Sequence, residues 1–167
     1  MAETIMSPRG LFVHELKTLL WVERKLADEV LPELRELVHA TDLKRDVEHH
    51  LEETRAHVRN LERVFGLINV KPEAEESETV KGLRREHDDG LKLLPDDDAP
   101  LRDLFHAGAI ARTEHVEIAA YGNLIAMAEL MGEKDVAIAL RENLEQEESA
   151  LRKAARAVPR LLAEAVR

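Results

Sequence analysis

Apolar residues recur through most of this chain three or four positions apart, which is the spacing of amphipathic helices. The first apolar stripe begins after a Ser-Pro pair at positions 7 and 8, a typical helix start. Pro32 interrupts this stripe, but leucines at helical spacing continue beyond it. We therefore predict a first helix over residues 8–39 that is kinked at Pro32.

Three further stripes predict three more long helices. They cover residues 42–68, 100–131 and 134–158. Pro100 opens the third helix and Gly132 ends it, because proline suits the first helical position and glycine the residue after the last. Pro159 is predicted to stop the fourth helix, so that a short helical tail docks outside the bundle.

The segment between the second and third helices is long enough to cross the length of a helical bundle. It comprises residues 71–99, starts with an acidic linker and contains a stretch of weaker helical character over residues 79–94. Two helical hairpins joined by such a crossover are typical of four-helix bundles. The pattern predicts one all-α domain over residues 1–167, a four-helix bundle whose long crossover carries an extra helix.

Each of the four long helices has a glutamate on its apolar stripe. These residues are Glu23, Glu53, Glu114 and Glu147, and Glu117 lies one turn after Glu114. The first two are 30 residues apart and the last two 33, which gives a pseudo-repeat. Taken singly, each glutamate also fits a helix edge or an interhelical salt bridge. Taken together, they indicate a buried two-metal site, because two cations offset the cost of burying several carboxylates.

Histidines on the second helix accompany these acids. His50, Glu53 and His57 lie on one face, in the reverse of the usual Glu-x-x-His order, and Ala150 stands where the fourth helix would carry a histidine. His50 is either a metal ligand or a hydrogen-bond donor to a ligating carboxylate. His57 is predicted to be structural or peripheral. Glu117 either replaces the missing histidine as a ligand or pairs with an arginine.

Two neighbours on the third helix have weaker claims to a role at the site. Tyr121 lies two turns after Glu114 and is either a hydrogen-bond donor behind the ligands or an ordinary core residue. His115 points about 100° away from Glu114 around the helix, so we expect an ordinary, partly buried polar residue.

Composition excludes several classes of function. The chain has 167 residues, a formal net charge of −10 and no cysteine. The charge argues against nucleic-acid binding, and the lack of cysteine excludes disulfides, thiolate zinc sites and iron–sulfur clusters. There is no apolar run of roughly 20 residues and no signal peptide, so we expect a cytoplasmic protein without a membrane partner. Any metal must be held by His, Asp or Glu, which favours iron, manganese or zinc.

Several segments resemble the YciE/YciF-type ferritin-like family. They are Leu11–Leu16, Glu23–Leu26, His50–Thr54, Leu144–Glu148 and, most distinctively, Glu114–Gly122 with the sequence E-H-V-E-I-A-A-Y-G. The resemblance implies a rubrerythrin-like bundle, a di-iron carboxylate centre, a homodimer and a link to stress responses. This chain departs from the family at His57, where glutamine is usual, and at Leu151, where an acid is absent.

The leading functional hypothesis is a stress-related protein with two iron ions, or else manganese or zinc. We expect it to react with dioxygen or peroxide or to oxidise iron, with no catalytic residue beyond the metal ligands and an unidentified redox partner. The predicted ligands are Glu23, His50, Glu53, Glu114, Glu117 and Glu147. The alternative is a metal-free structural or interaction bundle. A cage-forming iron store is less favoured, because the sequence shows no oligomer interface.

Overall fold

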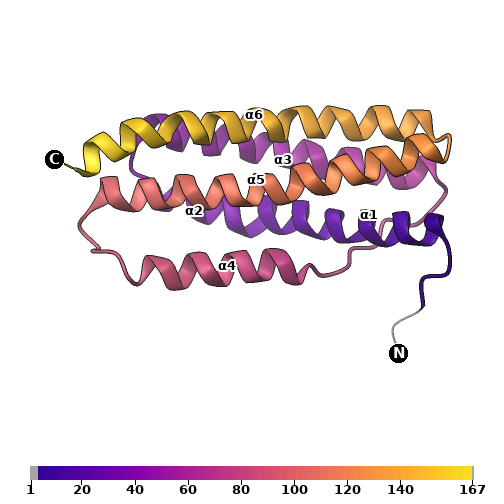
Figure 1. The fold of residues 1–167 in the computed structure, drawn as a ribbon, viewed down its shortest axis with the longest axis horizontal. Helices are drawn as coiled ribbons and strands as arrows, with labels where there is room; N and C mark the ends of the chain where they lie inside the picture. Colours follow the sequence, from indigo (N-terminus) through magenta and orange to yellow (C-terminus); the bar gives the residue numbers. More distant parts are fainter. Residues whose placement is uncertain (1–3, 167) are drawn as a thin grey trace.

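The computed structural model of the protein describes residues 4–166, and all regular structure within that range is helical (Figure 1). The elements are α1 (Pro8–Lys25), the π-helical turn η1 (Leu26–Val30), α2 (Leu31–Leu37), α3 (Thr41–Leu67), α4 (Glu78–Leu91), α5 (Ala99–Leu130) and α6 (Lys134–Ala165). Together, α1, η1 and α2 form one rod that packs with α3, α5 and α6. The crossover helix α4 lies along the outside of this four-helix bundle (Figure 1). The predicted fold class is confirmed.

The first rod is irregular just before Pro32 rather than at it. Proline has no N–H to donate into the helix, and the chain responds with the π turn η1 immediately upstream. The rod ends at Leu37, two residues earlier than predicted, because Val38 adopts an extended backbone. Buried Asp103 of α5 then accepts hydrogen bonds from the backbone N–H groups of His39 (3.0 Å) and Ala40 (2.6 Å). This carboxylate attaches the α2–α3 turn to the second hairpin.

The predicted stop at Pro159 is wrong, because α6 continues through the proline to Ala165. A proline inside a helix costs about 3 kcal/mol, so something beyond it must offset that cost. Leu161 is fully buried, and the Arg160 guanidinium lies 2.6 Å from the Asp42 carboxylate at the start of α3. The segment predicted to be a separate tail is therefore the packed last part of α6.

The long helices of the bundle pack together mainly through apolar side chains. In contrast, α4 is attached to them mainly by its polar side chains. Among α4 residues only Val80 is buried. Arg84 pairs with Glu33 of α2, Lys81 lies 5.9 Å from the ring centroid of Trp21, and His87 hydrogen-bonds to His106 of α5 at 3.0 Å. No helix within residues 4–166 is long and apolar enough to cross a bilayer.

Candidate metal centre

Glutamates and histidines from four long helices meet inside the bundle in two overlapping groups. The first group is His50, Glu114, Glu117 and Glu147, and the second is Glu23, His57 and Glu147. Within each group, one ligand atom from every residue lies within 4.8 Å of the others. All six side chains are buried, with at most 4% exposed. Because Glu147 belongs to both groups, the two groups form one continuous site.

In the first group, His50 of α3 faces the carboxylates of α5 and α6. Its Nε2 atom lies 3.2 Å from Glu114 Oε1 and 3.7 Å from Glu147 Oε2. Glu117, one turn after Glu114 on the inner face of α5, is 1% exposed. Neither oxygen of Glu117 has a hydrogen-bond partner in the described part of the chain. Glu117 therefore lies among carboxylates with no arginine paired to it.

The second group has a similar arrangement two turns further along α3. The Nδ1 atom of His57 lies 2.9 Å from Glu147 Oε1 and 3.4 Å from Glu23 Oε1. The ring centroids of His50 and His57 are 6.5 Å apart. The two imidazoles thus lie side by side on α3, each facing a different oxygen of Glu147.

Hydrogen bonds behind these residues hold the second group in place. The Nε2–H of His57 donates to the amide oxygen of Gln146 at 2.8 Å, so Nδ1 is the ring nitrogen that faces the carboxylates. The Tyr121 hydroxyl donates to Glu23 and accepts from the Asn143 amide at 2.8 Å. The two alternatives for Tyr121 are both realised, since it is a fully buried core residue and a donor behind the site.

Burial raises the pKa of every carboxyl group at the site, but the net shift of Glu147 is opposite to the others. Burial raises the pKa of Glu114 to about 7, and it raises the pKa of Glu117 well above the usual range, an effect that the nearby Glu147 charge increases. Burial and Glu147 also raise the pKa of Glu23. For Glu147, burial acts in the same upward direction, but the contact with His57 outweighs it and lowers the pKa overall. Of these four carboxylates, Glu147 is therefore the one whose ionised form the neighbouring imidazoles stabilise most.

The two imidazoles respond to the same crowding of carboxylates. Burial alone would lower the pKa of His50, yet Glu114 raises it well above its ordinary value. Burial also opposes protonation of His57, but hydrogen bonds to Glu147 and Glu23 raise its pKa to about 10. Without metal, the site therefore gathers protons to balance its carboxylates.

The donor atoms present fit metal ions. Both oxygens of Glu117, the Oε2 atom of Glu147 and one oxygen each of Glu23 and Glu114 are buried without a hydrogen-bond partner within residues 4–166. A buried polar atom left unpaired costs about 1–3 kcal/mol, so several of them at one place require another partner. Carboxylate oxygen and imidazole nitrogen are ligands suited to iron, manganese and zinc. These residues can hold a metal ion.

Glu53 is placed differently from the other predicted ligands. It is outside both groups, with its Oε2 atom 3.6 Å from Nδ1 of His50 and its Oε1 atom 3.0 Å from Nε2 of exposed His49. It therefore lies at the edge of the His50 ring that faces away from Glu114. The prediction that Glu53 is itself a ligand stays a prediction.

Of the two roles predicted for His57, the peripheral one is wrong, and the structural one stays a prediction. The side chain of His57 is fully buried between Glu23 and Glu147. Its spacing carried a usable signal, because seven residues after His50 is two helical turns and therefore the same face. Asn143 and Gln146 carry no comparable signal in the sequence. His115, expected to be partly buried, is exposed, and its Nδ1 contacts the Ala111 carbonyl at 2.7 Å.

Comparison with known proteins gives concordant results. Protein YciF of Escherichia coli strain K12 is 28% identical over 139 residues, which cover 83% of this chain and 82% of that protein. The crystal structure of the E. coli stress protein YciF matches with a TM-score of 0.87 and 25% identity, over 94% of this chain and 98% of that chain. The structure of YcfI from Rhodopseudomonas palustris matches with a TM-score of 0.88 and 30% identity, over 93% and 97%.

The chain also matches the family described as a domain of unknown function, DUF892, over residues 7–167. The family match, the YciF relative and the YciF structure together confirm the predicted resemblance to the YciE/YciF-type ferritin-like family. Because the match spans nearly all of its residues, this protein belongs to the DUF892 family.

Proposed function

We propose that this protein holds two iron ions, or else manganese ions, between α1, α3, α5 and α6. In this proposal it reacts with dioxygen or peroxide, or oxidises iron, under stress. The observation that carries the proposal is the pair of overlapping His/Glu groups joined by Glu147. The description of E. coli YciF as a stress protein supports the physiological setting.

Each group would hold one ion. His50, Glu114 and Glu117 would bind the first, Glu23 and His57 the second, and Glu147 would contact both. Bound iron would supply an open coordination position at which an oxygen species is reduced. The chain's own contribution is to orient the ligands: Gln146 fixes the His57 ring, Tyr121 fixes Glu23, and the surrounding apolar core excludes water.

Glu53 has a supporting role in this proposal. Its carboxylate faces Nδ1 of His50, the ring nitrogen that the first group does not use. A carboxylate behind a ligating histidine sets the ring orientation and increases its basicity. Glu53 would therefore orient His50, whereas direct ligation by Glu53 is the alternative that metal titration of a Glu53 variant tests.

Metal analysis tests the proposal directly. The protein is purified, stripped with a chelator and reconstituted anaerobically with Fe(II), and its optical spectrum is recorded after oxidation. We expect about two ions per chain, as in other carboxylate-bridged bundles. Glu147→Ala should lose both, whereas the control Glu142→Ala, on the exposed face of the same helix, should keep both. Wild-type protein that takes up no iron, manganese or zinc would rule the proposal out.

A metal-free structural bundle is the second candidate. YcfI of R. palustris is provisionally described as a structural protein. In that case Glu147 would be a buried charge with no purpose, and Glu147→Ala would leave unfolding stability unchanged or raise it, with or without added metal. The unpaired oxygens of Glu117 and Glu147 favour the metal-binding proposal, since a structural core gains nothing from them.

Quaternary structure forms a separate part of the proposal. The family resemblance predicts a homodimer, and the composition predicts a cytoplasmic setting. Multi-angle light scattering of the purified chain distinguishes a dimer from the large shell that an iron store needs.

A further inference from the structure

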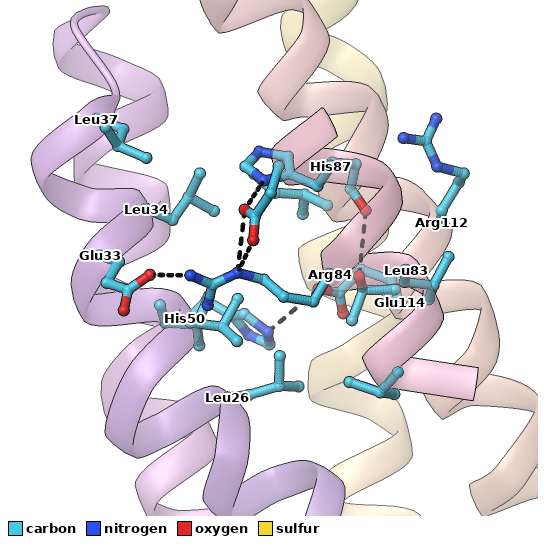
Figure 2. A pocket seen from close by; sticks show the side chains of 17 residues that line it. Leu26, Glu33, Leu34, Leu37, His50, Leu83, Arg84, His87, Arg112 and Glu114 are labelled. Atoms are coloured by element: carbon cyan, nitrogen blue, oxygen red, sulfur yellow. Dashed lines mark hydrogen bonds and ion pairs between the residues drawn. The ribbon is translucent and has the colours of Figure 1, made fainter. Parts of the chain in front are cut away.

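A pocket opens beneath α4 and reaches the first metal group (Figure 2). Its walls come from η1 and α2, from α4 and from α5. Among the lining side chains are Leu26, Leu31, Leu34, Val80, Leu83 and Ile110. His50 and Glu114 also line it, so the pocket connects the outside of the bundle with the ligands of the first group. Its volume is about 100 Å³.

The charged residues at the rim largely satisfy one another. The Arg84 guanidinium lies between Glu33 of α2 and Asp88 of α4, with its Nε atom 3.0 Å from Asp88 Oδ2 (Figure 2). Arg112 lies to the other side of α4 and is exposed. Because Arg84 is already paired with two acids, it adds little selection for charge, and Arg112 is the positive side chain that the rim leaves exposed. Selection by size and shape must come from the apolar walls.

The π turn η1 contributes to these walls. Leu26 and Val30, its first and last residues, both line the pocket, and so does the adjacent Leu31. A π turn inside an α-helical rod is rare, and such turns occur frequently at functional sites. The π turn therefore lies at the pocket, and no second π turn occurs within residues 4–166.

The character of the walls indicates what enters. Hydrated Fe²⁺ and hydrogen peroxide gain nothing from leucine side chains, whereas each methylene group moved from water to such a surface is favourable. A dry apolar cavity of roughly 150 Å³ is large enough for benzene, so a slightly smaller one that opens outward accommodates a chain of a few carbons. At the inner end, the groups that an incoming molecule meets are His50 and Glu114.

We infer that this pocket binds a small amphipathic molecule, a short alkyl chain with an oxygen-donor head group directed at the first metal position. The head group is a carboxylate or a hydroperoxide, both of which offer oxygen lone pairs to a hard cation. For the head group this inference rests on the proposed metal centre, but for the alkyl chain it rests only on the pocket. It assigns the substrate of the centre to the class of alkyl-bearing molecules.

Calorimetric titration with straight-chain monocarboxylates, from acetate to octanoate, tests the inference. It is carried out on metal-free protein and on protein loaded with zinc, which is redox-inert. We expect affinity to rise by up to about fourfold for each added methylene group until the pocket is filled. The dependence should hold in both forms, with the loaded form tighter by a constant factor. Affinity that does not depend on chain length would overturn the inference.

Three variants locate the binding. Ala109→Leu fills the pocket from α5, and the matched control Ala126→Leu makes the same change on the exposed face of that helix. We expect hexanoate affinity to fall at least tenfold in the first and to stay unchanged in the second, with metal content unchanged in both. Leu34→Ala widens the pocket instead, so the chain length at which affinity levels off should increase. Equal hexanoate affinity in all variants would contradict the inference.

The failure of this inference and that of the proposed function are distinguishable. If affinity does not depend on chain length but two ions still bind, the pocket proposal is wrong and the metal-centre proposal stands. If the protein binds no metal but affinity in the metal-free protein still depends on chain length, the metal-centre proposal is wrong and the pocket proposal stands. Hexyl hydroperoxide and hexanol, titrated against hexanoate on zinc-loaded protein, identify the preferred head group. Hexanol binding as tightly as both would show that the head group does not reach a metal ion.

Discussion

The two hairpins of the bundle contribute unequally to the candidate metal centre. The first hairpin, α1 to α3, provides one carboxylate and two imidazoles, whereas the second, α5 and α6, provides three carboxylates: Glu114, Glu117 and Glu147. The near-equal spacing of the inward glutamates had suggested two equivalent halves. The difference shows that the demand for positive charge originates mainly in the second hairpin. The first hairpin supplies both imidazole nitrogen donors of the two groups.

The largest expected effect is a difference in metal binding between a glutamine substitution in the second hairpin and one in the first. Glu147→Gln keeps the size of the side chain but removes the charge that both groups share, so we expect loss of both ions. Glu53→Gln alters only the residue behind His50, and affinity for one ion should fall about 10- to 100-fold with two ions still bound at saturation. Competition with a metallochromic indicator measures both. Equal losses in the two variants would show that the hairpins are equivalent after all.

A reversal of stability order is the next expected effect. In metal-free protein, Glu117 is a buried carboxylate without a partner in the described chain, so Glu117→Leu should raise unfolding stability by about 1–4 kcal/mol. Metal at a thousand times its dissociation constant raises the free energy of unfolding of the wild type by about 4 kcal/mol, which is roughly 10 °C in the unfolding midpoint. The increase should be smaller in the variant, which has lost a ligand. Thermal unfolding with and without chelator should therefore rank the two proteins in opposite orders.

The same comparison shows how far the sequence could predict the structure. The four long helices and the inward position of Glu23, Glu114 and Glu147 follow from a strong apolar period, which local residues determine. Glu53 and His57 lie only about 40° apart around α3, and which of them turns inward depends on the rotation that packing imposes on the helix. The continuation past Pro159 depends on the burial of Leu161 against distant residues, which local rules do not include.

Buried imidazoles outside the metal groups provide a contrast with those of the first hairpin. Whereas carboxylates raise the pKa of His50 and His57, burial and the neighbouring His87 lower that of His106 to about 4. Unfolded His106 binds a proton below about pH 6.5, but the folded form does so only below about pH 4. Stability should therefore fall as the pH decreases between these values, by at most roughly 3 kcal/mol from this group.

Urea unfolding of His106→Gln between pH 7 and pH 4 measures that contribution. The variant lacks the titrating ring, so its stability should decrease less than that of the wild type over this range. His115→Gln removes an exposed histidine of the same helix and is the control, with the pH dependence of the wild type. Parallel curves for the wild type and His106→Gln would show that the ring is not held neutral by the α4–α5 contact.

The smallest effect is expected where the second hairpin supports a residue of the first. Gln146 of α6 accepts the Nε2–H hydrogen bond of His57 and thereby determines which ring nitrogen faces Glu23 and Glu147. Gln146→Leu keeps a side chain of similar size but removes the acceptor, so affinity for the second ion should fall about tenfold and affinity for the first should not change. Gln146→Glu retains an acceptor and should bind within a few-fold of the wild type. If both variants bind like the wild type, His57 is oriented by packing within α3 alone, and the hairpins do not cooperate at this residue.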